Sequence, residues 1–167
     1  MRYGCVLAGL IFVCAMQVFG QERGGVTTDR VDITFGTAFM HVGVSPAFNA
    51  PGLDLGSQYH LTSWLGYSGQ MWFGTSANAT VRNYLFGPEV TLRRRVSPFA
   101  HVLIGVAHLS QNNHADTSFG AAVGGGITLK VESRVSWRVF ELDYAPTYFR
   151  SGRQDNIRFS SGFTLRF

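Results

Sequence analysis

His108 and Ser110 lie two positions apart, the spacing that puts both side chains on one face of a β-strand. A neighbouring imidazole can take the proton of a serine hydroxyl, so that the oxygen can attack an acyl ester. The sequence offers no clear third group to orient the imidazole, and the pair also fits ordinary polar residues at the rim of a strand. We therefore keep ester hydrolysis as an alternative and expect a protein without catalytic activity.

Other residues with reactive side chains form no recognisable site. The remaining histidines lack the spacing of metal ligands and are expected in a polar interior or in loops: His41, His60, His101 and His114. Glycines 124–126 fall within a strand pattern with no helix after them, which argues against a nucleotide site. The sequence predicts neither a metal site nor a cofactor.

The N-terminus has the pattern of a secretory signal peptide. Arg2 supplies a positive charge, residues 5–15 are an almost unbroken apolar run, and residues 18–20 offer a cleavage site. We expect residues 1–20 to be a cleaved signal peptide and residues 21–167 to form one domain. Both cysteines, Cys5 and Cys14, lie in the predicted signal peptide, so the exported chain would contain no thiol.

The composition favours a barrel whose outside faces lipid. Charged residues make up 14% of the chain and aromatic residues another 14%, whereas about 25% charged residues is usual in soluble domains. The net charge of +4 comes from arginines spread along the whole chain, so we expect no nucleic-acid partner. The three arginines at 93–95 are expected in a solvated turn near lipid headgroups.

The last segment of the chain alternates between two kinds of residue. Apolar side chains occupy the odd positions Ile157, Phe159, Phe163, Leu165 and Phe167, and polar or small residues occupy 158, 160, 162, 164 and 166. This period of two indicates a β-strand with two different faces. Arginines opposite aromatic residues are typical of a membrane strand with one face toward lipid and the other toward the lumen.

Seven further segments alternate in the same way, within residues 31–42, 53–61, 65–73, 84–93, 98–108, 119–130 and 134–144. Residues 45–52, 74–79, 111–116 and 151–155 are predicted loops, longer than the turns that alternate with them. Pro88 predicts a bulge or bend, and a slip of parity near Arg138 predicts a β-bulge. Because open strand edges are not tolerated in lipid, we expect an eight-stranded antiparallel transmembrane up-and-down β-barrel.

The predicted barrel has a polar interior of both charge signs. Eight strands enclose a space just wide enough for side chains to fill it, so no water channel is expected. The residues predicted to face inward are Asp32, Glu89, Arg93, Lys130, Glu141, Asp143, Arg158 and Arg166. They predict a lumenal network of salt bridges, whose individual pairs the sequence does not identify.

Four stretches, at residues 84–89, 96–101, 119–127 and 156–162, resemble the small outer-membrane β-barrel domain proteins of Gram-negative bacteria. These proteins are relatives of the OmpA transmembrane domain and of OmpX. The resemblance implies an eight-stranded barrel in the outer membrane and no particular reaction. The terminal Phe167 resembles the signal that the barrel-assembly machinery recognises.

We therefore expect a monomeric outer-membrane barrel with a structural, envelope-integrity or surface-interaction role, at most porin-like for very small solutes. Its expected partners are outer-membrane lipids and the barrel-assembly machinery. The alternative is a lipid A deacylase or phospholipase-type esterase, because such enzymes use a His-x-Ser arrangement, although residues 111–113 do not match the fuller motif. A soluble barrel around an apolar ligand would need the opposite placement of polar and apolar faces.

Overall fold

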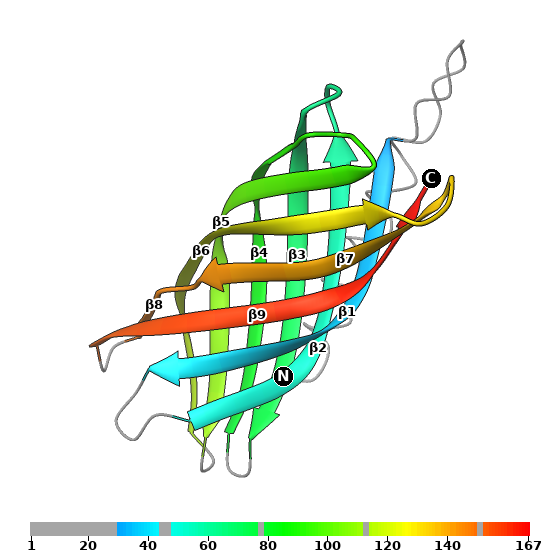
Figure 1. Cartoon of the computed structure of the whole chain (residues 1–167). Helices are drawn as coiled ribbons and strands as arrows, with labels where there is room; N and C mark the ends of the chain where they lie inside the picture. The colour runs from blue at the N-terminus through cyan, green and yellow to red at the C-terminus, as the bar shows by residue number, and fades with distance from the viewer. Residues whose placement is uncertain (1–29, 44–47, 77–78, 112–113, 150–151) are drawn as a thin grey trace.

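The alternating segments of the sequence form one antiparallel sheet that closes on itself (Figure 1). The computed structural model describes residues 30–43, 48–76, 79–111, 114–149 and 152–167. The strands are β1 (Val31–Gly43), β2 (Phe48–His60), β3 (Leu65–Ser76), β4 (Ala79–Thr91), β5 (Val96–Gln111), β6 (His114–Lys130), β7 (Val135–Tyr144), β8 (Thr147–Phe149) and β9 (Gly152–Arg166). The predicted signal peptide lies outside these residues, and within them no helix is long and apolar enough to span a bilayer.

The barrel has eight strands because β7 and β8 are two parts of one. Both pair with β6 on one side and with β9 on the other, and only Ala145 and Pro146 separate them. Each strand runs antiparallel to its neighbours in the sequence, which is the predicted up-and-down order. The predicted fold and strand number are confirmed.

The barrel closes between its first and last strands. The pairing of β1 with β9 runs from Asp32 opposite Arg166 to Gly43 opposite Asp155. Val31 and Phe167 exchange two backbone hydrogen bonds, of 3.2 and 2.8 Å. We call the end of the barrel where these two residues meet the terminal end, and the other the opposite end. Closure removes the open sheet edge that would otherwise expose unpaired backbone groups.

Large apolar side chains cover the outer wall, and polar ones fill the inside. On β9 the exposed fraction is 59% for Phe163 and 2% for Arg158, so alternate residues lie on opposite sides of the wall. Exposed apolar residues occur on every long strand, among them Phe35, Leu53, Tyr67, Phe86, Ile104, Val123, Leu142 and Phe159. This is the predicted placement of faces, and the reverse of that in a soluble protein.

Several strands extend farther at the opposite end than the sequence predicts. Residues 48–52, 74–76, 114–116 and 152–155 belong to strands although they were predicted as loops. Pro51 is tolerated there because it pairs with Phe39 of β1, and the pairing of β2 with β3 begins only at Gly52. The segments between strands at this end shrink to residues 44–47, 77–78, 112–113 and 150–151, so the predicted contrast of short turns and longer loops is wrong.

Pro88 does not cause the predicted bulge. The pairing of β4 with β5 is interrupted at Gly87 and Pro88 and resumes at Glu89 in the same register. On the other side, Pro88 pairs regularly with Tyr67 of β3. Proline has no backbone N–H group, and the structure accommodates this by leaving Gly87 and Pro88 unpaired with β5. No extra residue is inserted into either strand, so there is no bulge.

The predicted bulge in β7 is confirmed. The register of β7 shifts between Arg138 and Glu141 against β9, and between Ile127 and Thr128 of β6 on the other side. At the bulge, the backbone carbonyl of Arg138 accepts a hydrogen bond from a side chain. The donor is the hydroxyl of Ser161 on β9, at 3.1 Å. Arg138 and Glu141, three positions apart, consequently both point into the barrel, where they are buried.

Candidate functional site in the barrel interior

Five residues on five neighbouring strands form one row across the inside of the barrel wall. Glu89 of β4 pairs with His101 of β5, which pairs with Gly124 of β6. Gly124 pairs with Asp143 of β7, which pairs with Arg158 of β9. The antiparallel register thus brings acidic, basic and imidazole side chains to one level, although 69 positions separate the first from the last in the sequence.

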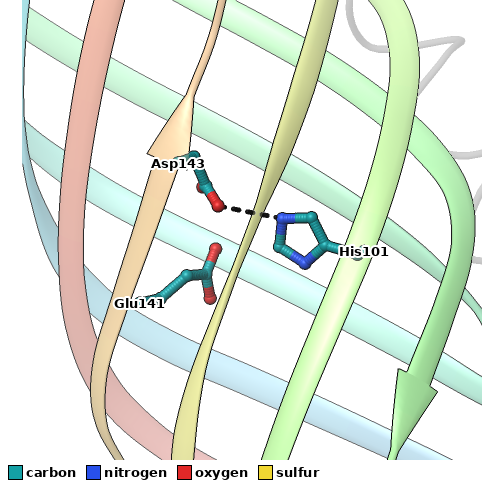
Figure 2. Close-up of side chains that lie close together, drawn as sticks. All are labelled: His101, Glu141 and Asp143. Atoms are coloured by element: carbon teal, nitrogen blue, oxygen red, sulfur yellow. Dashed lines mark hydrogen bonds and ion pairs between the residues drawn. The ribbon is translucent and has the colours of Figure 1, made fainter.

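Gly124 allows the two side chains beside it to meet. Nε2 of His101 lies 2.9 Å from Oδ1 of Asp143, and strand β6 runs between the two strands that carry them (Figure 2). A Cβ atom on Gly124 would lie 2.0 Å from the same Asp143 oxygen. The absence of a side chain at position 124 is therefore required for this hydrogen bond.

Arg158 connects the row to the far side of the lumen. Its Nε donates to Asp143 at 2.9 Å, and one terminal nitrogen lies 2.9 Å from Oε1 of Glu141. The other terminal nitrogen lies 3.4 Å from Asp54 of β2, and the guanidinium also donates to the amide oxygen of Gln70, on β3. The side chain thus spans the barrel from one wall to the other.

Arg138 is the second buried guanidinium of this region. The bulge directs it inward, where NH1 donates to Oε2 of Glu141 at 2.6 Å. Its guanidinium carbon lies 4.4 Å above the ring of Phe99, a cation–π contact. The sequence indicated the bulge but not that Arg138 would face the lumen.

We call the following seven buried residues the central cluster: Asp54, Glu89, His101, Arg138, Glu141, Asp143 and Arg158. Four carboxylates and two guanidiniums are removed from water here, which is tolerable only where charges are paired and hydrogen-bonded. The predicted lumenal network is confirmed for Glu89, Glu141, Asp143 and Arg158. Lys130 lies on the same side of the wall as its buried pairing partner Ser136, but its own side chain is exposed at the end of β6.

A second polar layer lies toward the terminal end. Asp32 contacts Nε2 of His60 at 3.1 Å and Nε of Arg166 at 3.2 Å. Thr34 and Thr164 share a hydrogen bond of 2.8 Å across the closing strands. Two of the predicted inward residues, Asp32 and Arg166, are thus paired with each other.

Toward the opposite end the interior contains an apolar cluster and buried polar residues such as Asn83 and Asn156. The buried apolar residues there and beside the central cluster include Met40, Val42, Ala50, Trp72, Val81, Leu85 and Leu103. A recess lined by Met40, Val42, Val81 and Leu109 has a volume of about 10 Å³, which is about the space of one water molecule. Side chains therefore fill the barrel beyond the central cluster as well.

The remaining histidines divide between the two sides of the wall. His60 and His101 are buried in the lumen, as expected. His41 lies on the outer face, contrary to the expectation, because β1 continues through it with unchanged alternation; its Nδ1 lies 2.8 Å from Asn49. The side chain of His114 lies outside the described residues.

His108 and Ser110 lie on the outward-facing side of β5, as the alternation predicts. Nδ1 of His108 lies 2.7 Å from the hydroxyl of Thr117 on β6. The nearby Asp116 accepts a hydrogen bond from the backbone N–H of Thr117 at 2.8 Å. The imidazole is thus held by a hydroxyl in place of the carboxylate that a catalytic triad uses.

A closed antiparallel barrel with eight strands, an apolar outer wall and a charged, filled interior is the fold of the small outer-membrane β-barrels. No protein-family profile and no curated protein matches the sequence. Among solved structures, the chain is similar to Neisserial surface protein A (NspA), with a TM-score of 0.68 and 12% sequence identity. That match covers 82% of this chain and 97% of the other.

Two further solved structures have the same fold. The attachment invasion locus protein Ail of Yersinia pestis gives a TM-score of 0.53 at 14% identity, covering 82% of this chain and 99% of that chain. The N-terminal β-barrel domain of Pseudomonas aeruginosa OprF gives 0.50 at 15% identity, covering 82% and 98%. At such identities the likeness establishes the fold alone.

Proposed function

We propose that the protein is a non-catalytic structural barrel of the Gram-negative outer membrane whose lumen does not conduct. The observation that carries this proposal is the side chain of Arg158, which contacts Asp143 on one wall and Asp54 on the other. A charged bridge across the lumen, with a recess beyond it that has space for about one water molecule, supports a lumen without a continuous water path.

The outer wall supports the placement in a membrane. A soluble monomer rarely exposes an apolar patch larger than a few hundred Å². Here exposed apolar side chains extend around the barrel, from Phe35 of β1 to Phe163 of β9. Strands of 10 to 17 residues, apart from the short β8, can cross a bilayer, for which about 9 to 11 residues suffice.

The short connections favour an envelope-stabilising role over recognition by loops. The strands continue to within a few residues of one another at the opposite end, as at Ser76 and Ala79. Little chain is therefore available for the extended loops that carry binding functions in many barrels.

Single-channel recording in planar bilayers tests the closed lumen. The refolded full-length protein should give no conductance steps under conditions in which a known porin does. Reproducible steps from the unaltered protein would contradict a filled lumen.

Tryptophan quenching tests which side of the wall faces lipid. Trp137 is 41% exposed on the outer wall, whereas Trp72 is fully buried inside. In proteins that retain one of these tryptophans, lipids with brominated chains should quench Trp137 strongly and Trp72 weakly. Recovery from cells in the soluble fraction, or equal quenching of both, would contradict the proposal.

A further inference from the structure

His101 has one ring nitrogen that is hydrogen-bonded and one that lies only within ion-pair distance of a carboxylate. Nε2 lies 2.9 Å from Asp143, whereas Nδ1 has no hydrogen-bond partner among the described residues. Nδ1 faces Oε2 of Glu89, which has no such partner either, while the other oxygen of Glu89 accepts a hydrogen bond of 3.2 Å from Thr91. The side chains of His101 and Glu89 are only 0% and 1% exposed, so bulk water does not satisfy the two atoms.

The distance between these two atoms indicates what fits there. Nδ1 and Oε2 are 3.8 Å apart, too far for a hydrogen bond, which spans about 2.7 to 3.2 Å. Two groups bridged by a water molecule lie farther apart. With two ordinary hydrogen bonds and a tetrahedral angle at the water oxygen, they are separated by about 4.4 Å. A transition-metal ion bonded to both at about 2.1 Å holds them about 3.4 Å apart at a tetrahedral angle and about 4.2 Å apart in a linear arrangement, and the observed distance lies between these limits.

The partner on the other ring nitrogen supports the same conclusion. A histidine that binds a metal through one nitrogen usually donates the N–H of the other to a carboxylate, which fixes its tautomer. Asp143 is placed for that role, and the close pairing over Gly124 holds the imidazole in this orientation. In the neutral imidazole, Nδ1 then presents a lone pair to Glu89, a carboxylate that can only accept, and a cation between them, either a metal ion or a proton, resolves the repulsion.

The charge of the central cluster leaves room for a cation. Its four carboxylates are faced by two guanidiniums, and with a neutral imidazole the cluster carries two excess negative charges. A divalent ion would bring the buried charge to zero, as two protons would in its absence, because uncompensated charge is costly away from water.

We propose that the barrel binds one divalent transition-metal ion between Nδ1 of His101 and Oε2 of Glu89. Ligand atoms of His101, Glu141 and Asp143 lie within 4.8 Å of one another (Figure 2), which makes Glu141 a candidate third ligand, and its two oxygens would have to exchange the hydrogen bonds that they accept from Arg138 and Arg158. A site of imidazole and carboxylates buried from water suits zinc. The sequence predicted no metal because these residues are far apart along the chain and meet only through the strand register.

The test is to refold the exported chain, residues 21–167 without the two cysteines of the predicted signal peptide, in detergent with zinc chloride or with EDTA. Because the ligands come from β4, β5 and β7, the ion has to enter as the barrel forms. After desalting, the zinc-refolded protein should contain one zinc per chain and have a higher midpoint of thermal unfolding than the EDTA sample. Magnesium, which prefers oxygen ligands and retains its water, should not raise the midpoint.

Matched variants locate the site. His101→Gln and Glu89→Gln should each abolish zinc retention, while His60→Gln should retain it. His60 is a fair control because it is also a buried lumenal histidine facing an aspartate, Asp32. Circular dichroism establishes that each variant is folded. The visible absorption of bound cobalt in the unaltered protein is an independent readout that needs no variant.

Two outcomes would overturn the proposal. Wild-type protein that retains no zinc and unfolds at the same temperature in zinc and EDTA would show that protons occupy the cluster. Zinc that stays bound to folded His101→Gln would show a different, adventitious site. Neither outcome affects the proposed closed lumen, which the conductance and quenching experiments test separately.

Discussion

His101 and Asp143 are hydrogen-bonded at 2.9 Å although a complete strand, β6, lies between the two strands that carry them. The bond passes over Gly124, the residue of β6 at the same level. A methyl group at this position would contact both the Asp143 carboxylate and the backbone of Leu142.

Gly124→Ala should therefore lower the free energy of unfolding by about 2 to 4 kcal/mol, through overpacking and loss of the buried hydrogen bond. Urea unfolding in detergent micelles, followed by tryptophan fluorescence, measures this change. Gly120→Ala is the matched control, because a Cβ atom there would lie 3.4 Å from Ala107, an ordinary contact. Equal effects of the two substitutions would contradict the special role of position 124.

Arg158→Met should destabilise the barrel by about 3 to 5 kcal/mol, because it leaves Asp54, Glu141 and Asp143 without their shared cation. The same urea titration detects the loss. Arg153→Ala removes an arginine from the same strand, but its pair with Asp155 is exposed, so no measurable change is expected. A mild effect of Arg158→Met would mean that the carboxylates are neutralised in another way.

Ser161→Ala should cost about 1 to 3 kcal/mol, because it removes the hydroxyl that satisfies the Arg138 carbonyl at the bulge. An unpaired carbonyl is especially unfavourable in a wall that faces lipid. The control is Thr37→Val on β1: Thr37 is exposed and pairs with Ser161 across the closing strands. Removal of the Thr37 hydroxyl should leave the free energy of unfolding unchanged or raise it. Unfolding of both variants in lipid vesicles measures the difference.

Purified protein should release no fatty acid from lipid A or phospholipid, and Ser110→Ala should behave identically. The reason is that the hydroxyl of Thr117 contacts Nδ1 of His108, where a catalytic triad has the carboxylate or amide that orients the imidazole. Mass spectrometry of lipid A from cells with either protein measures the acyl chains. Loss of an acyl chain that depends on Ser110 would restore the esterase hypothesis.

The alternation of residue types was sufficient to predict which side of the wall each strand presents. It predicted the lipid-side position of Phe163 and the lumenal position of Arg158, since β-strand geometry alone determines them. The alternation also predicted the bulge near Arg138. An extra residue in a strand exchanges the inward and outward positions that follow it, and the sequence shows this exchange.

The pairs inside the lumen could not be predicted. Asp54 and Arg158 are 104 positions apart, and their contact depends on the stagger of all strands around the barrel. The ends of strands were also misjudged, because proline, glycine and asparagine indicate turns only where pairing with a neighbour does not override them. Pro51 lies inside a strand for this reason.

The position of Arg158 on the last strand has a consequence for assembly. A sheet that has reached β7 holds Asp54, Glu141 and Asp143 in place with Arg138 as the only buried guanidinium of the central cluster. β9 therefore supplies the guanidinium that pairs with these carboxylates in the same step that joins it to β1. One strand thus completes both the backbone pairing of the wall and the charge pairing of the interior.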